Sequence, residues 1–201
     1  MEADWEIEIG ADAPVIDAAW EGYVDLRRAP ERIVEIRETL QYPSLADTLI
    51  RLNSPSSPVW TVKCDVWPAD VVDPDEMDAD AEHAVEGLAC YIDLVPSTVA
   101  PRSTTLESIL DPISGWCKQL CLHLRTQRFR QSRVDAVARR AFLTANIEGL
   151  GVTVYLTACG MSAQEAREVW SRALAILADS VLAVGAPAPQ GSKYNEDSVG
   201  E

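Results

Sequence analysis

Three short segments of the chain place tyrosine, threonine and aspartate side chains two positions apart. Residues 23–26 and 91–94 are Tyr-Val-Asp-Leu and Tyr-Ile-Asp-Leu, and residues 153–156 are a weaker copy, Thr-Val-Tyr-Leu. In a β-strand, side chains two apart project from the same face of the sheet. Each segment therefore predicts one polar face and one apolar face. Tyrosine rings can stack on a ligand and carboxylates accept hydrogen bonds, so the polar face is suited to binding.

The same alternation extends the predicted polar face to neighbouring segments. Thr61, Asp135, Thr153 and Thr157 are expected on it, whereas Val62 is expected to point towards the helices. Three roles are open for this face: a solvated surface whose charges pair across strands, an interface with a second copy or another protein, or a catalytic site. An exposed sheet face shields chemistry poorly from water, which argues against catalysis. The candidate ligand- or partner-binding residues are Tyr23, Asp25, Lys63, Asp65, Tyr91, Asp93, Arg139 and Tyr155.

Periodicity places these residues on expected elements. Alternation of apolar and polar residues predicts strands near 5–9, 20–26, 60–67, 88–95, 134–138 and 152–156. Helical spacing predicts helices over 30–40, 44–52, 104–124 and 162–184.

Capping patterns mark the ends of the expected helices. Ser44 with Asp47, and Thr104 with Glu107, are typical of helix starts. Pro112 is expected to restart the third helix after Asp111, because proline suits a first helical turn. The last helix has the clearest boundaries, with a capping box at Ser162 and Glu165 and an end before Gly185.

The resulting order is strand, strand, helix, three times over. Such an order predicts an α+β two-layer sandwich, with a mostly antiparallel sheet and helices on one face. A competing interpretation begins at residues 20–26 and gives the ferredoxin-like order β-α-β-β-α-β with an added strand and helix. Residues 1–185 are expected to form one domain, and residues 186–201, rich in proline, glycine and charge, a disordered tail.

No motif for a metal, cofactor or catalytic group is present. Between Pro68 and Gly87 the chain is rich in carboxylates, but counting from Asp73 or from Asp78 fails to place the glycine and glutamate of a calcium loop. Two cysteines four apart in the third helix lack the second pair that a zinc site needs. The two histidines of the chain lie in no nucleophile motif. We therefore predict no cofactor and no metal site, and leave catalytic residues unassigned.

Charge narrows the classes of partner. The 201-residue chain has a formal net charge of −15, and residues 1–101 hold 22 acidic and 6 basic side chains. Such a chain is repelled by phosphate backbones and anionic lipids, so general nucleic-acid or membrane binding is not expected. An arginine-rich stretch at 125–140 is the exception, interpreted as a balance for the acidic half or as a site for a phosphate or acidic partner.

Other composition features indicate the compartment. No apolar run approaches the roughly 20 residues of a membrane span, and the N-terminus is acidic, unlike a secretory signal. Five cysteines, an odd number within apolar segments, are expected to be reduced and buried. A cytoplasmic location is the resulting prediction.

These features favour a non-enzymatic protein-binding or regulatory module, with a homodimer or a protein partner. An immunity- or antitoxin-like inhibitor is compatible, since an acidic surface can cap a basic toxin. The alternative is a small-molecule-binding domain or enzyme that uses Asp25, Asp65 and Asp93 for hydrogen bonding or acid/base chemistry, with Lys63 or Arg139 holding an anionic group. Mimicry of nucleic acid by the acidic half is a third hypothesis.

Overall fold

The computed structural model describes residues 1–10, 12–70, 72–97, 106–144 and 147–187, without the side chains of 106–109. Six strands form one mixed sheet in the order β1-β5-β6-β4-β3, and the short β2 pairs with β5 further along that strand. The strands are β1 (Glu2–Glu8), β2 (Ile16–Asp17), β3 (Val59–Ala69), β4 (Glu86–Pro96), β5 (Ser132–Thr144) and β6 (Ile147–Gly160).

Antiparallel pairing dominates the sheet, as the sequence predicts. β3 with β4, β4 with β6, and β5 with β6 are antiparallel, whereas β1 and β2 pair with β5 in parallel. The hairpin β3-β4 and the hairpin β5-β6 therefore meet through their second strands. In this junction Tyr91 of β4 lies directly opposite Tyr155 of β6.

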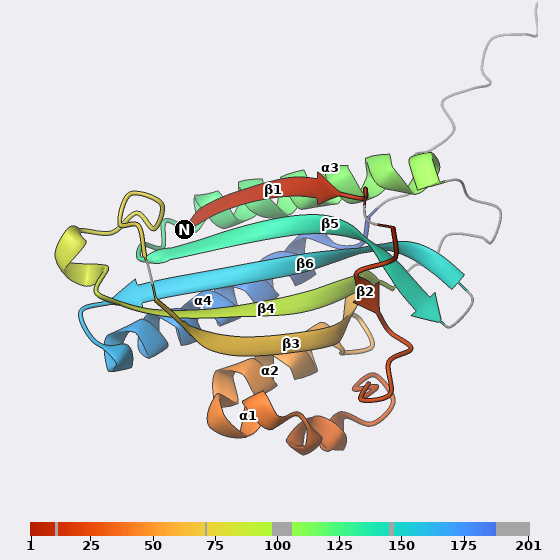
Figure 1. Ribbon diagram of the computed structural model, residues 1–201, viewed down its shortest axis with the longest axis horizontal. Helices are drawn as coiled ribbons and strands as arrows, with labels where there is room; N and C mark the ends of the chain where they lie inside the picture. The colour runs from red at the N-terminus through yellow and green to blue at the C-terminus, as the bar shows by residue number, and fades with distance from the viewer. Residues whose placement is uncertain (11, 71, 98–105, 145–146, 188–201) are drawn as a thin grey trace, which may run out of the picture.

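Helices cover one face of the sheet and make the second layer (Figure 1). α4 packs on β6 and β4, α3 packs on β1, β5 and β6, and α2 packs on α4 beside the edge strand β3. The two-layer α+β sandwich is thus confirmed. The helices are 3-10 helix η1 (Pro30–Glu35), α1 (Arg37–Gln41), α2 (Pro43–Leu52), 3-10 helix η2 (Ala81–His83), α3 (Leu106–Thr126) and α4 (Ala163–Val184).

The main core lies between the helices and the sheet. Alternate side chains of the central strands point into it, and those of Ile92, Val154 and Leu156 are fully buried. Leu120 of α3 and Trp170 of α4 meet them from the helix layer with no exposed surface. Burial of apolar surface between the layers is the main force that holds the helices to this face.

The predicted boundaries of α4 agree with the structure. Ser162 is the N-cap, and its side-chain oxygen accepts a hydrogen bond from the Glu165 N–H at 3.3 Å. Gly185, with φ of 76°, follows the last helical residue in a conformation that favours glycine. In α3, by contrast, Pro112 lies inside one continuous helix and does not start a new one.

Two other predicted helix starts differ from the structure or lie outside its description. α2 begins at Pro43 after Tyr42, with no side-chain cap, so the predicted capping pair at Ser44 and Asp47 is wrong. Proline at the first helical position has no N–H to leave unpaired, which makes a side-chain cap less necessary. Thr104, the side chain of Glu107 and most of the predicted tail, 188–201, lie outside the described residues.

The predicted strand at 20–26 is not a strand. Residues 18–29 run through turns, in which the Tyr23 N–H bonds the Trp20 carbonyl and the Ala29 N–H bonds the Asp25 carbonyl. The alternation of residue types does not correspond to alternating burial here, because Leu26 is buried in the main core whereas Trp20 and Gly22 are exposed. Hairpin followed by helix occurs in β3-β4-α3 and β5-β6-α4, so the three-fold repeat is not confirmed. The ferredoxin-like order, which began with the same segment, is not confirmed either.

A β-bulge in β3 reverses the predicted facing of two side chains. The register with β4 shifts between Thr61 and Cys64, so Thr61 lies opposite Leu94, whose side chain is in the main core. The Thr61 N–H and hydroxyl bond the side chain of Asn53 at the end of α2. Val62 packs instead in a second cluster, away from the main core. An extra residue shifts the alternation between the two sides of a bulge. Cys64 and Val66 keep the predicted facing, and Thr61 and Val62 are therefore reversed.

This second cluster forms beneath a segment that we call the strap, residues 12–28. The strap leaves the β1 side of the sheet, pairs with β5 through β2 and continues towards the β3 edge (Figure 1). It covers one end of the sheet face opposite α3 and α4, which we call the open face. The buried members of the second cluster are Ile16, Ala18, Trp60, Val62, Val95 and Ala141.

Candidate functional site

The centre of the open face carries a row of polar and aromatic side chains in cross-strand register. Asp65, Tyr91, Tyr155 and Asp135 are consecutive partners across β3, β4, β6 and β5. The rings of Tyr91 and Tyr155 lie 6.3 Å apart between centroids, and Trp67 lies 6.2 Å from Tyr91. We call Trp67, Tyr91 and Tyr155 the aromatic cluster. Its arrangement is near-symmetric, with a carboxylate flanking the tyrosine pair on each side.

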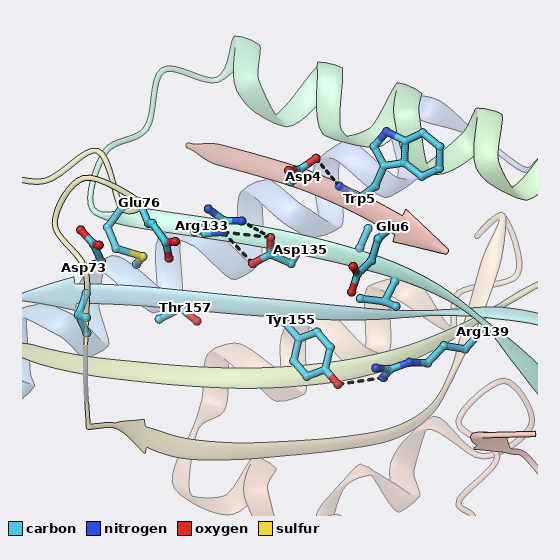
Figure 2. Close-up of a pocket in the computed structure, with 14 residues that line it drawn as sticks. Asp4, Trp5, Glu6, Asp73, Glu76, Arg133, Asp135, Arg139, Tyr155 and Thr157 are labelled. Atoms are coloured by element: carbon cyan, nitrogen blue, oxygen red, sulfur yellow. Dashed lines mark hydrogen bonds and ion pairs between the residues drawn. The ribbon is translucent and has the colours of Figure 1, made fainter. Parts of the chain in front are cut away.

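Arg139 of β5 lies beside the aromatic cluster. Its Nη1 donates a 2.9 Å hydrogen bond to the Tyr155 hydroxyl, and its guanidinium carbon is 5.6 Å from the centre of that ring (Figure 2). Its Nε donates to Glu8 of β1 at 2.7 Å. One arginine is thus held by an aromatic ring and a carboxylate together, a combination that favours cations.

Asp93 lies two residues along β4 from Tyr91, on the same face, and its side chain is nearly buried. It is 5 % exposed, and its Oδ1 accepts a 2.7 Å hydrogen bond from the Thr153 hydroxyl on β6. Burial raises the pKa of the Asp93 carboxyl, while the Thr153 hydrogen bond and the charges of Lys63 and Arg139 act in the opposite direction. Burial also raises the pKa of Tyr91 to about 12, so its hydroxyl remains protonated at neutral pH.

A cavity of about 480 Å³ lies between this face and the loop 72–77, and we call it the polar trough. Figure 2 shows Asp73 and Glu76 on the loop side, and Tyr155 and Arg139 on the sheet side. Met77 fixes the loop by burial, with 3 % of its surface exposed. The charged lining consists of Asp4, Glu6, Asp73, Glu76, Arg133, Asp135 and Arg139.

Both arginines that line the polar trough are paired with carboxylates of the same chain. Arg133 holds Asp135 of the same strand through several contacts of 2.8–3.0 Å, and Arg139 holds Glu8. The remaining carboxylates give the trough a negative character. From the predicted basic stretch, Arg125, Arg130 and Arg139 lie within 4.0 Å of carboxylates in the acidic half of the chain. Arg133 and Arg140 pair instead with Asp135 and Glu148 of the other half.

The structure separates the candidate residues into three places. Tyr91, Asp93, Tyr155 and Arg139 lie together on the central strands. Lys63 and Asp65 lie on the edge strand β3, where the Lys63 Nζ is 5.0 Å from the Trp20 ring and Asp65 is exposed.

The other two candidates belong to the strap and not to a strand. The ring of Tyr23 lies 5.9 Å from that of Trp60, and Asp25 bonds Arg27 at 2.9 Å. The hydrogen bond from Arg27 lowers the pKa of Asp25, whereas burial raises the pKa of Tyr23 to about 12. These two residues stabilise the strap over Trp60, whose ring the Arg27 guanidinium approaches to 4.0 Å.

Sequence reasoning did not select several residues of this face. Asp4 and Glu6 alternate with Trp5 in β1, and this alternation could have placed them on one face. Trp67 and Arg133 likewise share a face with residues that were selected. Nothing in the sequence indicated that the loop carboxylates Asp73 and Glu76 lie beside the sheet, because only the packing of the loop brings them there.

Ligands for a metal do not gather in the described part of the chain. No group of three or more histidine, cysteine, aspartate or glutamate side chains there could hold a metal ion. All five cysteines are free, and burial raises the pKa of Cys64, Cys90, Cys117 and Cys121 to about 12. Among the described helices, none combines the length and apolarity required to cross a membrane.

Comparison with known proteins found no similar protein. No protein-family model, no curated protein and no solved structure matches the chain.

Proposed function

We propose that the protein is a non-enzymatic binding module whose open face receives a basic segment of a partner protein. The observation that carries the proposal is the aromatic cluster, flanked by carboxylates on a sheet face that α3 and α4 leave uncovered. Aromatic rings with adjacent carboxylates match lysine and arginine side chains in both shape and charge.

Arg139 supports this chemistry from within the chain. Its guanidinium lies near the Tyr155 ring, donates to the Tyr155 hydroxyl and pairs with Glu8. A partner arginine above Tyr91 would find an equivalent environment, with Asp65 directly opposite Tyr91 on β3. Tyr91 and Asp65 have no arginine of this chain bonded to them in the described residues.

Long-range electrostatics point to the same class of partner. The net charge of −15 attracts basic proteins and speeds their association at low ionic strength. It also opposes pairing of two open faces, because each carries the carboxylates of the polar trough. We therefore favour a different protein over a second copy, acting in the cytoplasm. An inhibitor that covers a basic functional surface, as an immunity protein or antitoxin does, fits this description.

Affinity capture from the cells that express the protein tests the proposal. Wild type is compared with Trp67→Ala, which removes an exposed ring of the aromatic cluster, and with Leu122→Ala, a matched change of an exposed apolar side chain on α3. A basic partner should be recovered with wild type and Leu122→Ala and be lost with Trp67→Ala. Its association rate should fall as salt rises. Equal recovery with all three, or a partner that is acidic, would refute the proposal.

The burial of Asp93 supports a second candidate function for the same face: binding of a small molecule, or acid/base catalysis. A nearly buried carboxyl with a raised pKa, beside two tyrosines, is the kind of group that such sites use. Native mass spectrometry of gently purified protein decides between the functions. A mass excess that denaturation removes, and that Asp93→Asn and Tyr91→Phe abolish while the fold persists, would favour the second function.

A further inference from the structure

A second cavity, of about 370 Å³, lies at the bulge of β3, away from the polar trough. We call it the bulge pocket. It opens between the edge strand, the strap and the segment 35–38 at the start of α1. Its lining includes Trp20, Val24, Glu35, Arg37, Glu38 and Lys63.

The bulge itself creates the shape of this pocket. It turns Thr61 towards α2 and Val62 towards the strap, so the strand presents side chains on both sides of the opening. On the strap, a Cβ at Gly22 would overlap the ring of Trp20. Glycine at this position therefore lets the Trp20 ring lie along the strap beside the pocket.

Apolar side chains form the body of the bulge pocket. Trp20 and Val24 contribute from the strap, Ile36 and Leu49 from the helical side, and Val62 from the strand. The volume is near the lower end of the range for small-molecule sites, about 300 to 1,000 Å³. A mostly apolar cavity with a few polar groups at its rim is the usual form of such a site.

Charged groups at the rim determine the polarity of the ligand. Lys63 and Arg37 form no ion pair with a carboxylate in the described residues, and the Lys63 Nζ lies 5.0 Å from the Trp20 ring. Glu35 is neutralised by Arg32, which donates to both of its oxygens at 2.7–2.8 Å. After this pairing the described residues of the rim hold two cations, Lys63 and Arg37, and one carboxylate, Glu38. The excess of positive charge at this rim favours a ligand with one negative charge, although the Asp93 carboxyl also interacts with Lys63.

We propose that the bulge pocket binds a small apolar carboxylate, with its hydrocarbon body against Trp20 and Val62 and its carboxylate at Lys63. Binding is non-covalent, because an unactivated carboxylate does not react with a thiol; burial also raises the pKa of Cys64 to about 12. This site is distinct from the proposed protein-binding surface, although Tyr91 borders both. It requires no partner protein.

Phenylacetate is a suitable probe, because it has one ring and one carboxylate. Titrated into the full, isotope-labelled chain, it should saturably shift the Trp20 indole resonance and the backbone resonances of 61–64. Neutral phenylacetamide and cationic phenethylamine, of the same size, should bind more weakly. Lys63→Met should weaken phenylacetate binding about tenfold, the loss expected for one charge-assisted hydrogen bond. Lys118→Met, at an exposed lysine of α3, is the matched control and should leave binding unchanged.

Three outcomes would overturn the inference. They are no saturable shift at millimolar phenylacetate, equal affinity for phenylacetamide, and shifts confined to Tyr155 and Arg139 in the polar trough. Gly22→Ala gives independent evidence, because displacement of the Trp20 ring should weaken binding without changing any charge. Affinity capture of a basic partner tests the proposed function separately. The protein-binding proposal and the carboxylate-binding proposal can therefore each be refuted without the other.

Discussion

Asp93 carries its carboxyl group on the open face, yet its side chain is only 5 % exposed. Burial disfavours the charged form, so the pKa is higher in the folded than in the unfolded protein. Folding therefore takes up a proton in the window between the two pKa values. The stabilising contribution of protonated Asp93 is complete below the unfolded pKa, near the ordinary value of 3.8, and is lost as pH rises through the folded pKa.

Replacement of Asp93 by asparagine should stabilise the protein at neutral pH. Asparagine keeps an oxygen that accepts from the Thr153 hydroxyl but never becomes charged. The gain in free energy of unfolding should be absent at acidic pH, increase as pH rises through the folded pKa and then remain constant. Urea unfolding followed across this pH range measures the gain.

The control for this substitution is Asp70→Asn, at an exposed aspartate. Its effect on stability should be small and should lack the same pH dependence. Destabilisation by Asp93→Asn at neutral pH would show that the charged carboxylate stabilises the fold, contrary to this account. A stabilising asparagine would mean that the protein keeps Asp93 at a cost in stability, as functional residues often are kept.

At the scale of elements, Asn53 joins the end of α2 to the bulge of β3. Its side chain donates to the Leu49 carbonyl at 2.8 Å and to the Thr61 hydroxyl at 2.7 Å, and accepts from the Thr61 N–H at 3.2 Å. Both Asn53 and Thr61 are buried, so water cannot replace these bonds. This connection fixes α2 beside the edge strand and with it one side of the bulge pocket.

Asn53→Ala should destabilise the protein by about 2 to 3 kcal/mol, because it leaves the buried polar groups of Thr61 unsatisfied. Chemical denaturation measures the loss, and Ser56→Ala, on the exposed loop nearby, should change stability little. A loss as small as that of Ser56→Ala would show that the hydrogen bonds of Asn53 do not contribute to the free energy of unfolding.

The N-cap of α4 allows a second test at this scale. Ser162→Ala should lower the free energy of unfolding by about 1 kcal/mol, since the Glu165 N–H loses its acceptor. Ser162→Asp should restore stability, because aspartate is also a good N-cap. If alanine and aspartate behave alike in thermal or urea unfolding, the capping bond does not stabilise α4.

At the scale of the whole molecule, the net charge of −15 acts against the compact state. Raising ionic strength from about 0.01 M to about 0.15 M shortens the Debye length from about 30 Å to about 8 Å and screens this repulsion. The urea midpoint at pH 7 should therefore rise with sodium chloride. Near the sequence pI of about 4.5 the effect should disappear. A midpoint that falls with salt at pH 7 would show that the ion pairs of the surface outweigh the net repulsion.

Local sequence patterns predicted most elements from β3 to α4 and the polar character of one sheet face. Strand alternation and the Ser162 cap depend on residues close together in the chain, so they can be recognised without the fold. For the same reason Tyr91, Asp93, Tyr155 and Arg139 were placed on one face correctly, since they lie in regularly paired parts of β4, β5 and β6.

Contacts between distant parts of the chain could not be predicted from local patterns. β1 pairs in parallel with β5, more than a hundred residues away, and this brings Glu8 to Arg139. Packing of the strap over Trp60 replaces the predicted strand at 20–26, and the bulge in β3 exchanges the facing of Thr61 and Val62. Pairing partners and bulges are selected by the burial that the whole chain achieves, not by local propensity. The polar trough and the bulge pocket both arise from these long-range contacts.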